Sequence, residues 1–95
     1  MIRVGDYWLL ESDKHQKDHI KKHGGYQQLT KNRCYNVIKK VNKPTRVAID
    51  AGANVGLWSK DLCERFEVVF SVEPNPECIP VLEKNVADNL SLIHI

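Results

Sequence analysis

Residues 47–56 read Val-Ala-Ile-Asp-Ala-Gly-Ala-Asn-Val-Gly, a short apolar run that ends in an acid and a glycine-framed turn. Residues 57–66 follow with apolar side chains at helical spacing, so the pattern predicts a strand, a tight turn and a helix. We expect such a turn to leave free backbone N–H groups that point at one place. That place suits an anionic or nucleotide-like ligand.

A second acid lies at the end of the next predicted strand. Residues 68–72 are almost continuously apolar, which predicts a strand buried on both faces, and Glu73-Pro74 follows them. An acid about 20 residues past a glycine turn, at the tip of the neighbouring strand, is placed to accept hydrogen bonds from both hydroxyls of a ribose. The two strand ends together predict a nucleoside-binding edge.

The second half of the chain, residues 45–95, has the element order of half a doubly wound, Rossmann-like α/β sheet. Strands are predicted at residues 46–51, 68–72 and 90–95. The helix between the first two strands would bury one face, formed by Val55, Trp58, Leu62 and Phe66. A second helix is expected to begin at Asn75, with an inner face formed by Ile79, Leu82 and Val86 and a first turn disturbed by Pro80.

Residues 1–44 read as a leader of short strands and two helices. Two strands are expected around Gly5-Asp6, and a helix over residues 14–23, where Asp13 and Gln16 resemble a capping box and Gly24 marks the end. Only Ile20 is apolar in that helix, which places it on the surface. A second helix is predicted over residues 30–42, ended by Pro44, with one buried stripe formed by Cys34, Val37, Ile38 and Val41.

Composition and charge limit the function classes. The 95 residues are 42% apolar and 27% charged, and no apolar run approaches the length of a membrane span. Residues 1–46 hold 11 Lys/Arg against 4 Asp/Glu, whereas residues 47–95 hold 3 against 8. Lysine-rich solvated helices explain the basic half better than nucleic-acid binding does. The three cysteines lack a C-x-x-C pattern, which predicts reduced packing residues in a cytoplasmic protein.

Three nucleotide-binding patterns compete for the turn. The P-loop pattern requires a lysine after its last glycine, and Gly56 is followed by Leu57. The nicotinamide dinucleotide fingerprint requires G-x-G-x-x-G, whereas Ala53 and Asn54 follow Gly52. A pyrophosphate would lose the close approach that the middle glycine allows. Neither pattern is met.

The third pattern is D-x-G-A-N-x-G after a strand, with E-P closing the next strand, and it resembles class I S-adenosylmethionine-dependent methyltransferases. Residues 46–89 are most similar to the FkbM-like family, whose core reads similarly through I-D-A-G-A-N-V-G-L-W-S and V-E-P-N-P. Residues 7–9 and 24–26 resemble, more loosely, the leader of some phage-type members. The resemblance implies a cytoplasmic phage or bacterial enzyme that uses S-adenosylmethionine.

The resemblance also implies roles for the residues of the turn. Gly52 would let the backbone pass close to the methionine part of the cofactor, and Asp50 would face its ammonium end. Ala53 and Asn54 would line the turn, with Asn54 in a left-handed conformation. Gly56 would let the helix pack closely, and Glu73 would accept the two ribose hydroxyls.

The predicted activity is the transfer of a methyl group to a hydroxyl oxygen, with S-adenosylmethionine as cofactor. No residue is assigned as catalytic base, and neither the methyl acceptor nor a protein partner is identified. Two alternatives stay open: a nicotinamide-dependent oxidoreductase, and a non-catalytic nucleotide- or nucleic-acid-binding module. Three histidines lie at helical spacing (His15, His19 and His23), but no Cys or acid is placed as a third ligand, so no metal site is predicted.

The chain reaches only the third strand of the seven that such a domain normally carries. We therefore expect an inactive N-terminal fragment whose strand at residues 46–51 has one unpaired edge. Residues 90–95 read Leu-Ser-Leu-Ile-His-Ile, which resembles the in-frame translation of a transposase mosaic-end adapter used in sequencing libraries. The natural sequence would then end near Asn89. The alternative is a natural third strand, which the alternation of apolar and polar residues also favours.

Overall fold

A computed structural model describes residues 1–41, 46–87 and 92–94 of the chain. Its central element is a parallel sheet in the order β3 (Val47–Ala51), β4 (Val68–Val72) and β5 (Leu92–His94). The register pairs Asp50 with Ser71 and Ala51 with Val72, so β3 and β4 end side by side. This parallel order confirms the predicted strand–helix–strand–helix–strand arrangement; residues 90, 91 and 95 of the last predicted strand lie outside the described residues.

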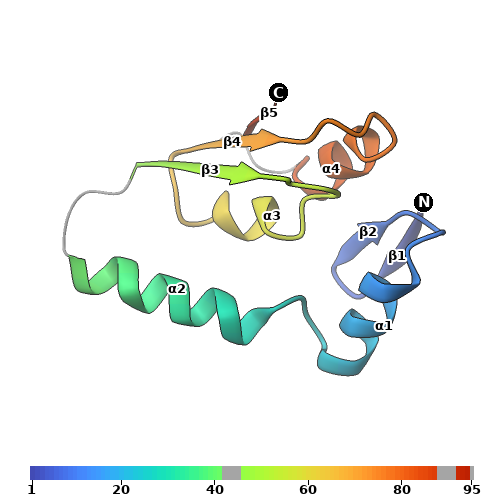
Figure 1. Ribbon diagram of the computed structural model, residues 1–95, viewed down its shortest axis with the longest axis horizontal. Coiled ribbons are helices and arrows are strands. Elements are labelled where there is room, and N and C mark those ends of the chain that lie inside the picture. The colour runs from blue at the N-terminus through green and yellow to red at the C-terminus, as the bar shows by residue number, and fades with distance from the viewer. Residues whose placement is uncertain (42–45, 88–91, 95) are drawn as a thin grey trace.

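The leader begins with an antiparallel hairpin, β1 (Ile2–Val4) and β2 (Tyr7–Leu9), followed by α1 (Lys14–His23) and α2 (Gln28–Val41). The predicted bounds of α1 are confirmed: Asp13 accepts a hydrogen bond from the backbone N–H of Gln16, and Gly24 ends the helix. The hairpin and α1 lie beyond the end of the parallel sheet, whereas α2 and α3 (Ser59–Leu62) lie on one side of it (Figure 1).

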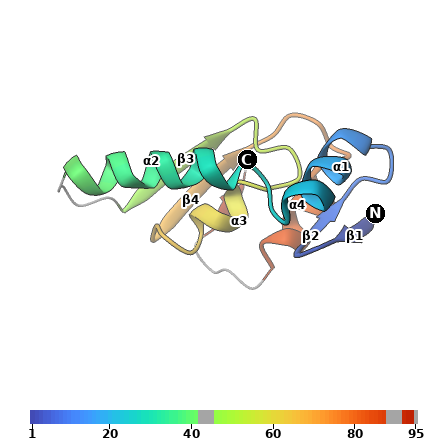
Figure 2. The same ribbon diagram turned by 90° about the horizontal axis from the view of Figure 1, so that it is seen from below.

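The predicted apolar stripe of α2 is wrong. Cys34 is exposed, so it is no packing residue, and the side chains of Val37 and Val41 are 62% and 56% exposed. Helix α2 instead contacts the rest of the chain through polar groups of Lys31 and Tyr35, whose hydroxyl donates to Asp61 (2.8 Å). Burial is the main cause that raises the pKa of Tyr35, followed by its bond to Asp61. Seen from below, α2 lies in front of the sheet (Figure 2). Pro44, the predicted end signal, lies outside the described residues.

Two helices are shorter than the sequence predicts. The predicted helix over residues 57–66 is reduced to α3, and turns follow it. The helix expected from Asn75 begins only at Ile79 as α4 (Ile79–Asn85). The Asn75 side chain instead accepts a hydrogen bond from Glu77 N (3.0 Å) in a local turn, which is a common use of asparagine. Pro80 therefore falls in the first turn of α4, where its missing N–H costs little.

The core consists of two groups of buried side chains. The leader cluster joins the hairpin and α1 to the turn and to α4; its members are Val4, Leu9, Ile20, Val55, Leu57, Cys78 and Val81. The sheet cluster lies between the sheet and helices α3 and α4; its members are Ala53, Leu62, Cys63, Val69, Leu82 and Val86. Val55 therefore packs with the leader and not with the helix face predicted for it. The division into residues 1–44 and 45–95 stays a prediction.

Asn85 of α4 ties the leader to the glycine turn. Its side chain is 4% exposed, accepts a hydrogen bond from Trp8 N (2.7 Å) and donates to the carbonyl oxygens of Trp8 (2.8 Å) and Val55 (2.7 Å). A buried amide that satisfies three backbone groups fixes the position of the elements that carry them. The hairpin is therefore held against the turn that follows β3.

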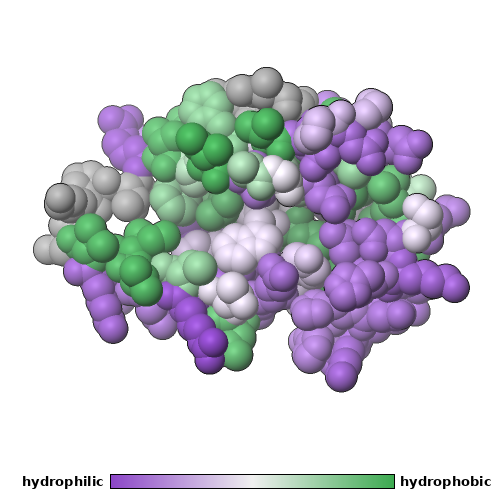
Figure 3. Space-filling view, viewed as in Figure 1, coloured by the Kyte–Doolittle hydropathy of each residue, from purple (hydrophilic) through white to green (hydrophobic). Residues whose placement is uncertain are grey.

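The parallel sheet has one covered face and one apolar, open face. Strand β4 buries Val69 and Ser71 but leaves Val72 38% exposed, so the prediction of burial on both faces is wrong. Val47 and Ile49 of β3 are 53% and 71% exposed, and within the described residues β3 pairs with β4 alone. Apolar surface accordingly gathers over the half of the molecule that holds α2, β3 and β4, whereas the α1 half is mostly hydrophilic (Figure 3).

Candidate functional site

The glycine turn after β3 brings most of the predicted site residues together. Gly52 and Gly56 have φ angles of +73° and +87°, and Asn54 has a φ of +53°, which confirms its predicted left-handed conformation. A Cβ at Gly52 would meet nothing within 4 Å, so the protein leaves open space beside that backbone. A Cβ at Gly56 would instead collide with the side chain of Leu82 on α4. Gly56 therefore permits close packing of α4 against the turn.

The free N–H groups expected at this turn are not free. The amides of Gly52 and Ala53 both donate to the carbonyl oxygen of Val72 (2.9 and 3.0 Å), and the amide of Gly56 donates to Ala53 O (2.9 Å). The amide of Asn54 donates to a carboxylate oxygen of Glu73 (2.6 Å). A phosphate-binding turn needs such donors for its ligand. Four amides of this turn are therefore not available to a pyrophosphate.

Glu73 joins the end of β4 to the turn. One of its carboxylate oxygens accepts the amide of Asn54, and the other accepts the amide of Asn75 (2.9 Å). Each oxygen of a carboxylate has two lone-pair sites, so each keeps one acceptor position beyond these bonds. The carboxylate is thus held by two backbone donors while it can still accept two hydrogen bonds from a ligand.

Asp50 belongs to a short chain of hydrogen bonds at the end of β3. Its Oδ2 accepts a hydrogen bond from the Ser59 hydroxyl (2.6 Å), which also contacts the hydroxyl of Ser71 (2.5 Å). Both serines are fully buried. Burial is the largest cause that raises the pKa of Asp50, while the Ser59 hydrogen bond and the charge of Lys31 lower it. The two serines carry no glycine-like or acidic signal, so the sequence did not mark them.

Replacing Asp50 by asparagine is expected to leave the protein as stable as the wild type at pH 7, or more stable. The raised pKa means that the folded state holds the Asp50 proton more tightly than the unfolded chain does. The ionised group therefore destabilises the fold, and this destabilisation grows as the pH rises from about 3.8, the ordinary value, through the folded-state pKa. Asparagine removes the charge and keeps an oxygen for Ser59.

Denaturant unfolding of Asp50→Asn at pH 7 and near pH 4 tests this linkage. The difference from the wild type should shrink at the lower pH. Asp18→Asn, which removes an exposed carboxylate on α1, is the matched control and should shift the unfolding free energy by less than about 0.5 kcal/mol at either pH. A variant of Asp50 that is clearly less stable than the wild type at pH 7 would contradict the account.

Lys31 is a buried cation, although it lies in the basic half of the chain, where solvated lysines were predicted. Its side chain is 0% exposed, its Nζ donates to the carbonyl oxygen of Leu57 (2.7 Å), and the rings of Trp58 and Tyr7 lie 5.5 and 5.8 Å from it. Burial lowers the pKa of Lys31, and nearby acids, Asp61 foremost, act in the opposite direction. Only the folded arrangement brings this amine to the segment that follows the turn.

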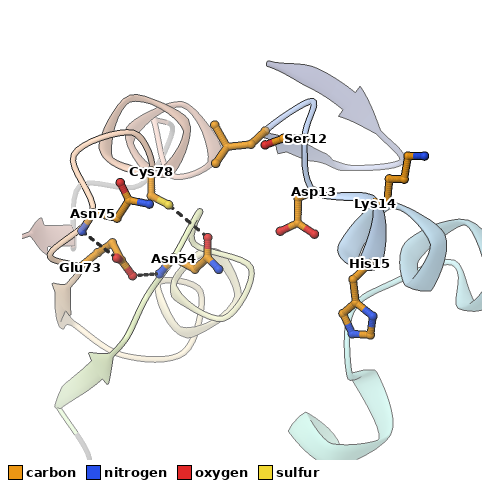
Figure 4. Close-up of a pocket in the computed structure, with 9 residues that line it drawn as sticks. Ser12, Asp13, Lys14, His15, Asn54, Glu73, Asn75 and Cys78 are labelled. Carbon is orange, nitrogen blue, oxygen red and sulfur yellow. Dashed lines mark hydrogen bonds between the residues drawn. The ribbon is translucent and has the colours of Figure 1, made fainter.

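Two cavities flank Asn54 and connect the turn to the leader. A cavity of ≈ 120 Å³ on the Asp50 side is lined by Gln16, Tyr26, Asp50, Gly52, Ala53, Asn54, Leu57 and Trp58. An open cavity of ≈ 540 Å³ on the Glu73 side is lined by Asn54, Glu73, Asn75 and Cys78 on one wall and by leader residues 10 and 12–15 on the other. Figure 4 shows the Glu73 carboxylate between Asn54 and Asn75, with Asp13 and His15 across the gap.

The structure therefore places five of the six predicted cofactor-binding residues around these cavities. Asp50, Gly52, Ala53 and Asn54 line the smaller one, and Asn54 and Glu73 line the larger one. The sixth, Gly56, lines neither and contacts α4. The leader wall, which includes Gln16 and Tyr26, was not predicted as part of the site. Within residues 1–41, 46–87 and 92–94 no cluster of three metal-ligating side chains occurs, and none of the described helices is long and apolar enough to cross a membrane.

Comparison with known proteins finds a similarity to a methyltransferase. Methyltransferase sdnD of Sordaria araneosa is 32% identical over 69 residues, which are 70% of this chain and 26% of that protein. The chain is similar to methyltransferases. No family model matches it. The chain spans about a quarter of the length of the curated relative that it matches.

A solved structure extends the likeness to the fold. Phosphoethanolamine N-methyltransferase 1 of Haemonchus contortus, crystallised with phosphoethanolamine and S-adenosylhomocysteine, matches with a TM-score of 0.52 and 18% identity. The match covers 62% of this chain and 13% of that one. At this identity the likeness concerns the fold alone, and it agrees with part of the Rossmann-like sheet of a class I methyltransferase.

Proposed function

We propose that this chain forms the cofactor-binding part of an S-adenosylmethionine-dependent methyltransferase of the FkbM-like type. One observation carries the proposal. The amides of residues 52–54 are bonded to β4 and Glu73, while two carboxylates, Asp50 and Glu73, flank the cavities. S-adenosylmethionine carries a positively charged sulfonium, a positively charged ammonium and one carboxylate, so its net charge is positive. A site with carboxylates and few free donors favours such a cation over a dinucleotide with two phosphate charges.

The two cavities support an extended pose of this cofactor. Its nucleoside end would occupy the larger cavity, where the ribose hydroxyls would donate to the two Glu73 oxygens that keep acceptor positions. Its amino-acid end would occupy the smaller cavity beside Asp50. The open space beside Gly52 would let the chain of the cofactor pass close to the backbone between the two ends.

The chemistry of such an enzyme is an in-line displacement at the sulfonium methyl group. The protein contributes mainly by aligning the acceptor with that methyl, which can be worth several kcal/mol. We propose a hydroxyl acceptor, as in the resemblance to the FkbM-like family, and such an acceptor needs a base for its proton. We assign no residue of this chain as that base or as part of the acceptor site.

Photo-crosslinking with tritiated S-adenosylmethionine tests the proposed function. Label should appear on peptides from residues 46–77, and unlabelled S-adenosylhomocysteine should suppress it. An equal concentration of nicotinamide dinucleotide should leave the labelling unchanged. Suppression by the dinucleotide would favour the oxidoreductase alternative, and labelling spread evenly along the chain would contradict a cofactor site at this edge.

A further inference from the structure

The side-chain amide of Gln16 is buried beside the site without a full set of partners. Gln16 lies in the first turn of α1 and is 7% exposed. Its Oε1 has no hydrogen-bond partner among the residues that the structure describes. Buried acceptors in proteins are almost always paired, because an unpaired one loses its bonds to water and gains nothing. The unpaired oxygen therefore calls for a donor that comes from outside the chain.

The helix cap does not use this amide. In a complete capping box, the glutamine at this position would accept a hydrogen bond from the backbone N–H of Asp13. That N–H instead donates to the carbonyl oxygen of Leu10 (3.1 Å). Only the other half of the box is present, in which the Asp13 carboxylate accepts a hydrogen bond from the backbone N–H of Gln16 (3.0 Å). The cap thus leaves the Gln16 side chain available for another contact.

The cavity that Gln16 lines offers hydrogen-bond acceptors and negative charge. Asp50 faces the same ≈ 120 Å³ space from the end of β3, and none of the described side chains that line it is cationic. Lys31 acts on Asp50 through its charge, but its Nζ donates to Leu57 O. A small cavity with a carboxylate and an unpaired amide oxygen is complementary to a compact cation with several N–H donors, such as a primary ammonium.

We infer that Gln16 Oε1 accepts a hydrogen bond from the α-ammonium group of the cofactor's amino-acid end. The inference rests on the proposed function and adds a residue outside the glycine turn to the site. The negative charge of Asp50 would attract the same ammonium, and the hydrogen bond to Gln16 would orient it. Helix α1 of the leader thereby becomes a wall of the cofactor site. It packs through Ile20 in the leader cluster with the hairpin, which Asn85 bonds to the turn.

Gln16→Met tests the inference, because methionine has a similar length and no strong acceptor. We expect this variant to bind S-adenosylhomocysteine about tenfold more weakly than the wild type, through the loss of one charge-assisted hydrogen bond. Its affinity for methylthioadenosine, which lacks the amino-acid end, should be unchanged. Gln28→Met is the matched control, since Gln28 is exposed on α2 and bonds Asn32; it should bind both ligands like the wild type.

The outcomes separate this inference from the proposed function. Equal affinities of wild type and Gln16→Met for S-adenosylhomocysteine would overturn the role of Gln16 and leave the proposed function standing. Binding of neither ligand by the wild type would overturn both. Nuclear magnetic resonance of the wild type gives a readout that needs no variant: the Gln16 side-chain amide signals should shift with S-adenosylhomocysteine and not with methylthioadenosine. Identical responses to the two ligands would overturn the inference.

Discussion

Replacing Glu73 by alanine is expected to weaken the binding of S-adenosylhomocysteine by about 1.5–3 kcal/mol, measured by titration calorimetry. The proposed pose makes two hydrogen bonds from the ribose hydroxyls to this charged carboxylate, and charge-assisted bonds are the strong ones. The same carboxylate also accepts the amides of Asn54 and Asn75, so its loss removes the two bonds that hold the turn to the end of β4. Both effects act in the same direction.

Glu77→Ala is the matched control for this experiment. Glu77 is an exposed acid in the same loop, and its removal should leave the affinity almost unchanged. Glu73→Gln should also bind S-adenosylhomocysteine more weakly than the wild type. In the glutamine, an NH2 group replaces one of the two carboxylate oxygens and would face a backbone N–H, which places a donor against a donor. Wild-type affinity in Glu73→Ala would remove Glu73 from the site.

Gly56→Ala is expected to lower the free energy of unfolding by about 2–5 kcal/mol. A left-handed backbone costs an alanine roughly 1–2 kcal/mol, and forcing extra atoms into a packed core costs roughly 1–3 kcal/mol. The new Cβ would collide with Leu82, whose side chain is 0% exposed and therefore has little room to move. Such a loss is a large fraction of the stability of a small domain. Denaturant unfolding followed by circular dichroism measures it.

Gly52→Ala separates the two causes of this loss. Gly52 has a similar φ of +73°, but a Cβ there would meet nothing within 4 Å. Alanine at this position should therefore cost only the backbone term, roughly 1–2 kcal/mol. The difference between the two variants measures the clash with Leu82. Equal losses of stability in both variants would show that α4 does not pack closely on the turn.

The strands and the turn could be predicted because their signals are local. The apolar runs that end in Asp50 and Glu73, and the glycines between them, mark strand ends and a left-handed turn whatever surrounds them. The prediction of a buried stripe on α2 was wrong because helical spacing identifies an apolar face without showing what covers it. The structure docks that helix through Lys31 and Tyr35, a choice that rests on partners far away in the sequence.

The site could be predicted only in part for the same reason. Five residues of the strand ends and the turn do line the cavities, but the state of the turn amides depends on how β3 aligns with β4. Ser59, Ser71 and Gln16 acquire meaning only through what the fold places beside them. The capping-box pattern even suggested a different use for the Gln16 side chain. Local patterns identified the candidate residues, and tertiary contacts decide what surrounds them.

A titration of the isotope-labelled chain with S-adenosylhomocysteine, followed by nuclear magnetic resonance of the backbone amides, tests the central claim most directly. We predict shifts centred on Gly52, Asn54 and Asn75, which surround the proposed ribose and methionine positions, with no comparable response to nicotinamide dinucleotide. The amide of Val37, on the exposed side of α2, serves as the internal control. No shift at the turn, or the same shifts with the dinucleotide, would contradict an S-adenosyl cofactor site.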